Sequence, residues 1–118
     1  MSPQELKQRT KRFALRVIRL TEALPRSPTA AVIGQQLLRS GTSVAANYRT
    51  ACRAKSKPDF IHKMAIVEEE LDESTLWMEL LVESEIVGNG RLAPLLKEAD
   101  ELLAMVVAAI KTARGGSR

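Results

Sequence analysis

Apolar residues recur every three or four positions through four long stretches of this 118-residue chain, and this spacing constrains the fold more than any other feature. Steps of three and four place side chains on one face of an α-helix. In the first stretch the residues of such a stripe are Leu6, Phe13, Val17, Leu20 and Leu24. No alternating run long enough for a half-buried strand accompanies them. The pattern therefore predicts an all-α protein.

Serine and proline mark where the helices are expected to begin. Ser2, Ser27 and Ser56 each stand within two residues ahead of a proline. A serine at this place caps the first turn, and proline in that turn forfeits no hydrogen bond. The predicted helices span residues 3–24, 28–54, 58–87 and 91–113, with residues 114–118 as a flexible tail. Since the joining turns are short, we expect one domain, residues 1–118, forming an antiparallel up-down-up-down four-helix bundle.

Two glycine-containing segments have different expected roles. Gly88-Asn89-Gly90 is predicted to end the third helix, because glycine and asparagine tolerate positive φ. Gly41 lies inside the second helix, where glycine costs about 1 kcal/mol relative to alanine. The apolar phase continues across Gly41, which favours close contact with a neighbouring helix over a break in the helix.

The cysteine count and the N-terminus indicate a location. The single cysteine, Cys52, excludes an internal disulfide and favours a reducing compartment. The N-terminal residues lack the apolar region of an export signal, and no stretch approaches the ~18 apolar residues of a membrane span. We therefore expect a cytoplasmic protein with no membrane association.

Charge is unevenly distributed along the chain, although the net charge is only +4. Residues 1–57 carry twelve basic and two acidic side chains (+10), whereas residues 58–90 carry one lysine against nine acids (−8). This contrast predicts charge pairing within the chain or between subunits, with solvated faces as the alternative.

Four arginines form a predicted stripe along the first helix, because Arg9, Arg12, Arg16 and Arg19 are three or four residues apart. The second helix and the turn after it are expected to extend this basic surface with Arg39, Arg49, Arg53, Lys55 and Lys57. Guanidinium groups bind phosphate in a bidentate manner, so these nine residues are candidates for nucleic-acid binding. Aromatic residues for stacking on bases are absent from the set. The alternative is that the arginines pair with the acids of the third helix.

The third helix has more apolar surface than one core requires. Its first seam comprises Phe60, Met64, Val67, Leu71, Met78 and Leu81. A second seam of Ile66, Trp77 and Leu80, completed by Glu70 and Glu73, is expected roughly opposite the first. Together with the outward-pointing Leu15, these six residues form a predicted homo-oligomer interface. The alternative is an irregular bundle that buries both seams itself.

Ser40 and Asn47 are predicted to be buried polar residues on the second helix. Asn47 is expected on the core side, with Glu70 or Glu73 as its hydrogen-bonding partner, where it would fix helix register.

The sequence contains few residues that would support a catalytic function. A di-iron bundle needs two Glu-x-x-His motifs, and the chain has one histidine, His62. We expect no metal and no cofactor. Only Lys57 stands at the distance from His62 that helical ribonucleases use, and Cys52 lacks a nearby activating base. The prediction is a non-enzyme with His62 at the surface.

Residues 10–112 resemble the bacterial "four helix bundle protein" family, whose members include proteins encoded within intervening sequences of large-subunit ribosomal RNA genes. The matching segments are Gln36–Ser40, Ser43–Tyr48, Lys55-Ser56, Asp59-Phe60 and the acidic run Glu68–Glu73 leading to Trp77. The chain departs from the pattern at Thr50, where relatives commonly have glutamate.

This resemblance implies a cytoplasmic homo-oligomer, with a ring of five subunits as the expected state. A related branch comprises accessory proteins of diversity-generating retroelements, which are basic pentamers that associate with a reverse transcriptase and nucleic acid. The leading hypothesis is therefore a non-catalytic oligomeric module that binds RNA or DNA. The second is a structural protein whose basic and acidic helices pair between subunits.

Overall fold

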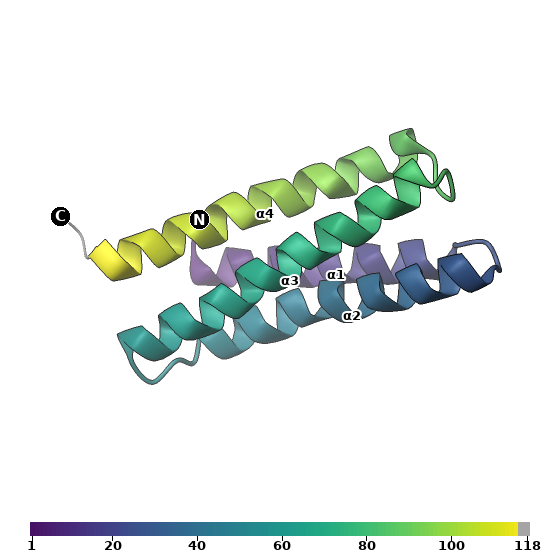
Figure 1. Cartoon of the computed structure of the whole chain (residues 1–118). Helices are drawn as coiled ribbons and strands as arrows, with labels where there is room; N and C mark the ends of the chain where they lie inside the picture. The colour runs from purple at the N-terminus through teal and green to yellow at the C-terminus, as the bar shows by residue number, and fades with distance from the viewer. Residues whose placement is uncertain (116–118) are drawn as a thin grey trace.

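Four antiparallel helices form a rod of 49 × 21 × 19 Å in the computed structural model, which describes residues 1–115 (Figure 1). The helices are α1 (Pro3–Glu22), α2 (Pro28–Ala51), α3 (Lys57–Glu83) and α4 (Asn89–Gly115). Each helix packs against its neighbours in the chain, and α4 closes the bundle with a sparser contact to α1. The predicted all-α four-helix bundle is confirmed.

The two helices of most contrasting charge lie diagonally across the bundle. Within residues 1–115, α1 contacts α2 and α4 but not α3. In Figure 1, α3 lies at the front and α1 behind it. The outer surfaces of α1 and α3 therefore face in opposite directions.

Three serines cap the helix starts as the sequence predicts. The Ser2 hydroxyl accepts a hydrogen bond from the Glu5 N–H at 3.1 Å, and the Glu5 carboxylate accepts one from the Ser2 N–H at 2.8 Å. This reciprocal pair lowers the pKa of Glu5, chiefly through the bond from the Ser2 backbone. Ser27 and Ser56 likewise accept hydrogen bonds from the N–H of the third residue of each helix, Ala30 in α2 and Asp59 in α3.

The end of α3 differs from the prediction. Glu85, not a glycine, adopts the left-handed conformation with φ of 65°. The N–H groups of Glu85 and Ile86 donate to the carbonyls of Val82 and Leu81, at 2.9 and 3.0 Å, and close the helix. Gly88 and Asn89 instead lie where α4 begins, because the Gly88 carbonyl accepts the Arg91 N–H at 3.1 Å.

Other helix ends are shifted by a few residues. The predicted ends of α1 and α2 lie beyond the observed ones because the chain tightens into i→i+3 hydrogen bonds, as from the Ala54 N–H to the Ala51 carbonyl at 3.1 Å. In contrast, α4 continues to Gly115, so the predicted tail is wrong for residues 114 and 115. Residues 116–118 of that predicted tail lie outside the described part of the chain.

One apolar stripe from each helix meets in a single core. On α3 the first predicted seam is buried from Met64 to Leu81, and on α1 the residues Phe13 and Val17 are fully buried. Leu24 and Phe60, at the ends of their predicted stripes, are half-buried. The predicted stripes of α1 and α3 are therefore buried except at Leu24 and Phe60.

Two glycines bring α2 close to α1. A Cβ on Gly41 would lie 2.9 Å from both methyl groups of Val17, and a Cβ on Gly34 would lie 2.7 Å from Leu24 Cδ1. The prediction of a close helix contact at Gly41 is confirmed. These contacts also fix the antiparallel register, since the end of α1 lies beside the first half of α2.

A short α1 leaves one end of the bundle open. With 20 residues, α1 is about 30 Å long, against about 40 Å for the 27 residues of α4. In Figure 1, α1 starts well inside that end. An apolar hollow of about 670 Å³ remains there, and Tyr48, Cys52, Phe60 and Met105 are among its lining residues. Burial, aided by a hydrogen bond to Cys52, raises the pKa of Tyr48.

We predict that Gly41→Ala destabilises the protein despite the better helix propensity of alanine. The added methyl group overpacks against Val17, which costs about 1–3 kcal/mol and exceeds the propensity gain of about 1 kcal/mol. Urea denaturation measures the free energy of unfolding. Gly90→Ala is the matched control, because a Cβ there meets no atom within 4 Å. In the double variant Gly41→Ala/Val17→Ala the two losses should be less than additive. A more stable Gly41→Ala variant would contradict the tight contact.

Candidate nucleic-acid interface

Arg9 is removed from the predicted phosphate-binding set by its contacts with α4. Its Nε and Nη2 donate to the Glu98 carboxylate at 2.7 and 2.9 Å, and Nη2 also donates to Glu101 Oε1 at 2.5 Å. About one-fifth of the Arg9 side chain is exposed. The paired carboxylates raise the pKa of Arg9, with the hydrogen bond to Glu98 as the main cause. Arg9 therefore links α1 to α4, and its guanidinium already has carboxylate partners where the prediction placed a phosphate.

Arg39 is likewise occupied, on the opposite side of the bundle. Its guanidinium donates a hydrogen bond to Glu73 and pairs with Glu70 at 3.3 Å; the hydrogen bond to Glu73 is the main cause of its raised pKa. The predicted pairing of an arginine with acids of the third helix is confirmed at this one position. Glu70 and Glu73 thus bind Arg39 and not Asn47, and both carboxylates of the predicted oligomer interface already have an intramolecular partner.

The remaining seven basic residues fall into two groups. Arg12, Arg16 and Arg19 lie along the middle and end of α1, and Arg16 alone among them is half-buried. Arg49, Arg53, Lys55 and Lys57 are all exposed, at the end of α2, in the turn and at the first residue of α3. Since α1 and α2 are antiparallel, this second group lies toward the opposite end of the rod from Arg19. The single predicted surface is therefore divided in two.

A basic residue that the sequence prediction omitted joins the first group. Arg91, in the first turns of α4, lines a hollow of about 250 Å³ together with Arg16 and Arg19. Leu20, Leu92 and Leu95 complete its lining, and all three are buried. The antiparallel order of the helices could have indicated this site, because it brings the end of α1 beside the start of α4.

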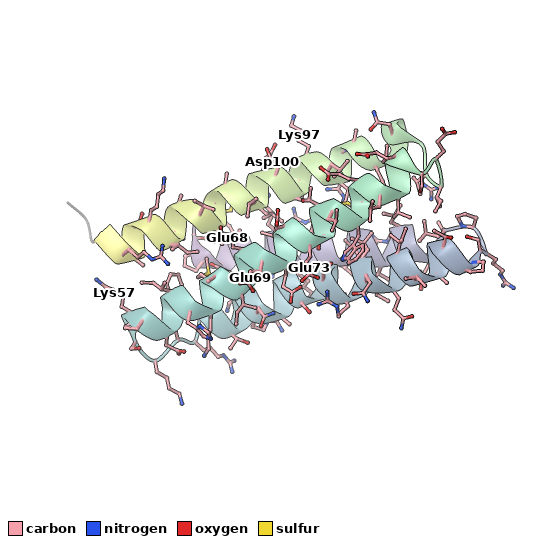
Figure 2. The ribbon with its side chains drawn as sticks, viewed as in Figure 1. Lys57, Glu68, Glu69, Glu73, Lys97 and Asp100 are labelled. Carbon is pink, nitrogen blue, oxygen red and sulfur yellow. The ribbon has the colours of Figure 1, made fainter. Side chains whose placement is uncertain are left out.

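The acidic residues gather on the face opposite α1. Figure 2 shows Glu68, Glu69 and Glu73 along α3, on the side of the bundle away from α1. Glu68 and Glu69, with Asp72, line a shallow depression beside Leu103 of α4. A polyanion approaching the bundle would be repelled from this face and attracted to the α1 side.

The second seam of α3 lies beside the first seam and not opposite it. At about 100° per residue, Ile66 and Trp77 fall on the same flank as Glu70 and Glu73, which reach α2. Ile66 is half-buried, and Trp77 packs against the core. Trp77 Nε1 is buried and has no hydrogen-bond partner within residues 1–115.

Large apolar side chains nevertheless remain exposed on α1, α2 and α3, those of α2 being Val32 and Leu38. Leu80 of the predicted interface is 37% exposed, and its helix neighbour Leu76, which the prediction omitted, is 46% exposed. On α1, Leu15 is 40% exposed, as predicted for an outward-pointing residue.

The two predicted buried polar residues differ in their surroundings. Ser40 is fully buried, where its hydroxyl lies 2.8 Å from the Ser74 hydroxyl and donates to the Leu37 carbonyl at 3.3 Å. Asn47 is only half-buried, so its predicted burial is wrong. The buried stripe of α2 is centred on residues such as Val44, and the longer Asn47 side chain lies at its edge.

Catalytic or metal-binding chemistry would depend on the single histidine of the chain. His62 is exposed at the start of α3, as the sequence predicts. Within residues 1–115, no three side chains of His, Cys, Asp or Glu converge to form a metal site. In this described part of the chain, no helix is long and apolar enough to cross a membrane.

These features define a small four-helix bundle with a basic α1 side and an acidic α3 side. Residues 3–108 match the 23S rRNA-intervening sequence protein family, and the chain belongs to this family. A crystal structure of a protein of unknown function from the S23 ribosomal protein family of Bacteroides thetaiotaomicron VPI-5482 is similar, with 33% identity and a TM-score of 0.88. The similarity covers 95% of this chain and all of that one. No curated protein matches the chain.

We predict that Arg9 stabilises the fold whereas Arg12 does not. Arg9→Ala leaves the Glu98 carboxylate half-buried without its partner, which costs about 1–3 kcal/mol. Arg12→Ala, at an exposed position on the same helix, should change the free energy of unfolding by less than about 0.5 kcal/mol. Chemical denaturation of both variants, and of Arg9→Ala/Glu98→Ala for the coupling energy, measures the difference. Equal effects of the two single substitutions would contradict the structural role of Arg9.

Proposed function

We propose that this protein is a non-catalytic binding module that holds RNA or DNA by its phosphates and serves as an accessory to a nucleic-acid enzyme such as a reverse transcriptase. The observation that carries the proposal is the group of arginines on the α1 side. Within residues 1–115, Arg12, Arg16, Arg19 and Arg91 have no ion-pair partner, unlike Arg9 and Arg39. Unpaired guanidinium groups are available to phosphates.

Electrostatics and composition support the same function. The acidic α3 lies diagonally across the bundle, so its field opposes binding least on the α1 side. No aromatic residue that could stack on a base belongs to this group of four arginines. The group therefore favours contacts with the nucleic-acid backbone over readout of the base sequence. We therefore propose binding that depends on phosphate spacing and salt concentration more than on base identity.

Charge reversal on α1 tests this function. A fluorescently labelled structured RNA and a DNA duplex of equal length are titrated with protein at several salt concentrations. The triple variant Arg12→Glu/Arg16→Glu/Arg19→Glu should bind more weakly, and the slope of log affinity against log salt should fall by about 2–3 units. The matched control reverses three exposed charges of α4: Lys97→Glu/Lys111→Glu/Arg114→Glu. Absent binding at low salt, or equal losses in both triple variants, would refute the proposal.

A second function, self-assembly, is favoured by the exposed leucines and the charges around them. Leu15 on α1 lies among Lys11, Arg12 and Arg19, whereas Leu76 and Leu80 on α3 lie among Asp72, Glu73, Glu79 and Glu83. We propose that the outer face of α1 in one subunit packs on the outer face of α3 in the next. Because the two faces differ, such contacts are head-to-tail, and they close into a ring when the rotation between neighbouring subunits is a whole fraction of a turn. The ring of five expected from the family resemblance is one such closed state.

We predict that Leu80→Arg reduces the assembly to monomers, because it places a charge in the apolar centre of the proposed contact. Light scattering coupled to gel filtration, at low and high salt, measures the mass of the assembly. Ala104→Arg is the control, since this exposed residue lies on α4, outside both proposed faces. A wild-type protein that is monomeric under both salt conditions would exclude self-assembly.

A further inference from the structure

The seam between α1 and α4 places arginines in two contrasting environments. At the level of Arg9, α4 presents the carboxylates of Glu98 and Glu101, which bind the guanidinium. Nearly two turns further along α1, at the level of Arg16, α4 presents another cation, Arg91. The same packing of helices therefore neutralises Arg9 and concentrates positive charge around Arg16.

Three guanidinium groups border this second position. Arg16, Arg19 and Arg91 line one hollow, and none of the six lining residues in the described part of the chain is acidic. The nearby Glu98 is already bound to Arg9. Like charges held around one small hollow repel each other, and an anion between them would convert this repulsion into attraction. The hollow therefore has the charge of an anion site.

The buried floor of the hollow further favours the binding of an anion. Leu92 is fully buried, and Leu20 and Leu95 are 7% and 5% exposed. Buried leucines support the aliphatic stems of the arginines while the charged ends remain in contact with solvent. They also lower the local polarity, so a charge bound above them interacts more strongly than it would in water.

The start of α4 adds a further positive contribution at the same end of the seam. Arg91 lies in the first turn of this helix, and that turn contains no acidic residue. The positive end of the helix dipole is therefore not offset by a carboxylate, as it is at Glu5 of α1 and Asp59 of α3.

We propose that the hollow lined by Arg16, Arg19 and Arg91 binds a phosphate monoester, and that its ligand is the terminal phosphate of a nucleic-acid strand. A monoester carries nearly two negative charges at neutral pH, whereas an internal phosphodiester carries one. Three arginines around one hollow match the dianion better than they match a single charge. The identity of the ligand as a nucleic acid rests on the proposed function, whereas the binding of a monoester does not.

Oligonucleotides that differ only at one end test this site. Fluorescence anisotropy compares one sequence with a 5′-phosphate, a 3′-phosphate or hydroxyl ends, at pH 7.5 and 5.5. We expect a phosphorylated strand to bind about tenfold more tightly than the hydroxyl strand. This difference corresponds to the gain of one charge-assisted hydrogen bond. The preference should shrink at pH 5.5, because the second phosphate pKa is about 6. Arg91→Gln should abolish the preference, so that phosphorylated and hydroxyl strands bind equally, while both bind more weakly because Arg91 also belongs to the proposed phosphate-binding group.

The control is Lys97→Gln, a cation of α4 outside the hollow, which should retain the preference. Thermal unfolding of each variant confirms that it folds, and Arg19→Gln provides a second variant of the hollow. Equal affinity of the wild type for phosphorylated and hydroxyl strands overturns this inference while the proposed function stands.

Binding of neither strand refutes the proposed function, and a titration with inorganic phosphate then tests the site alone. Side-chain ¹⁵N signals of Arg16, Arg19 and Arg91 should shift, and those of Arg49 and Arg53 should not. Absence of shifts, or equal shifts of all five arginines, overturns the monoester site.

Discussion

The close contact between α1 and α2 is the constraint on which the other surfaces depend. Gly41 allows Val17 to approach the α2 backbone, and Gly34 does the same for Leu24. The Ser40–Ser74 hydrogen bond then aligns α2 with α3 from inside the core. Once these registers are set, the end of α1 must lie beside the start of α4. The convergence of Arg16, Arg19 and Arg91 is thus a consequence of core packing.

Local sequence features were sufficient to predict the helices and their core faces. Apolar spacing and the serine caps depend only on residues within a few positions of each other, so they can be read without knowing the fold. The end of α3 could not be read in this way. Glu85 adopts a positive φ because the hydrogen bonds of Ile86 and Val87 to Leu81 hold it there, although glycines nearby would have adopted it more easily.

The charged surface was predictable only in part, because spacing along one helix does not reveal what the other helices present. Four arginines of α1 share a stripe, yet Arg9 alone meets two carboxylates of α4. Arg91 is isolated in the sequence and becomes part of a cluster only through the tertiary fold. Likewise, the second seam of α3 is covered on the flank that borders α2. Leu76 and Leu80 remain exposed because they lie beyond that flank.

The short α1 gives the rod two unlike ends. Along most of its length every helix has two neighbours, but beyond the start of α1 and the end of α2 only α3 and α4 continue. Fewer apolar contacts hold the helices at that end, so local opening costs less free energy there than at the end that holds Arg91. Mechanical polarity is thereby built into a nearly symmetric architecture: the end that holds Arg91 is the more rigid, and the other is more easily deformed around an apolar hollow.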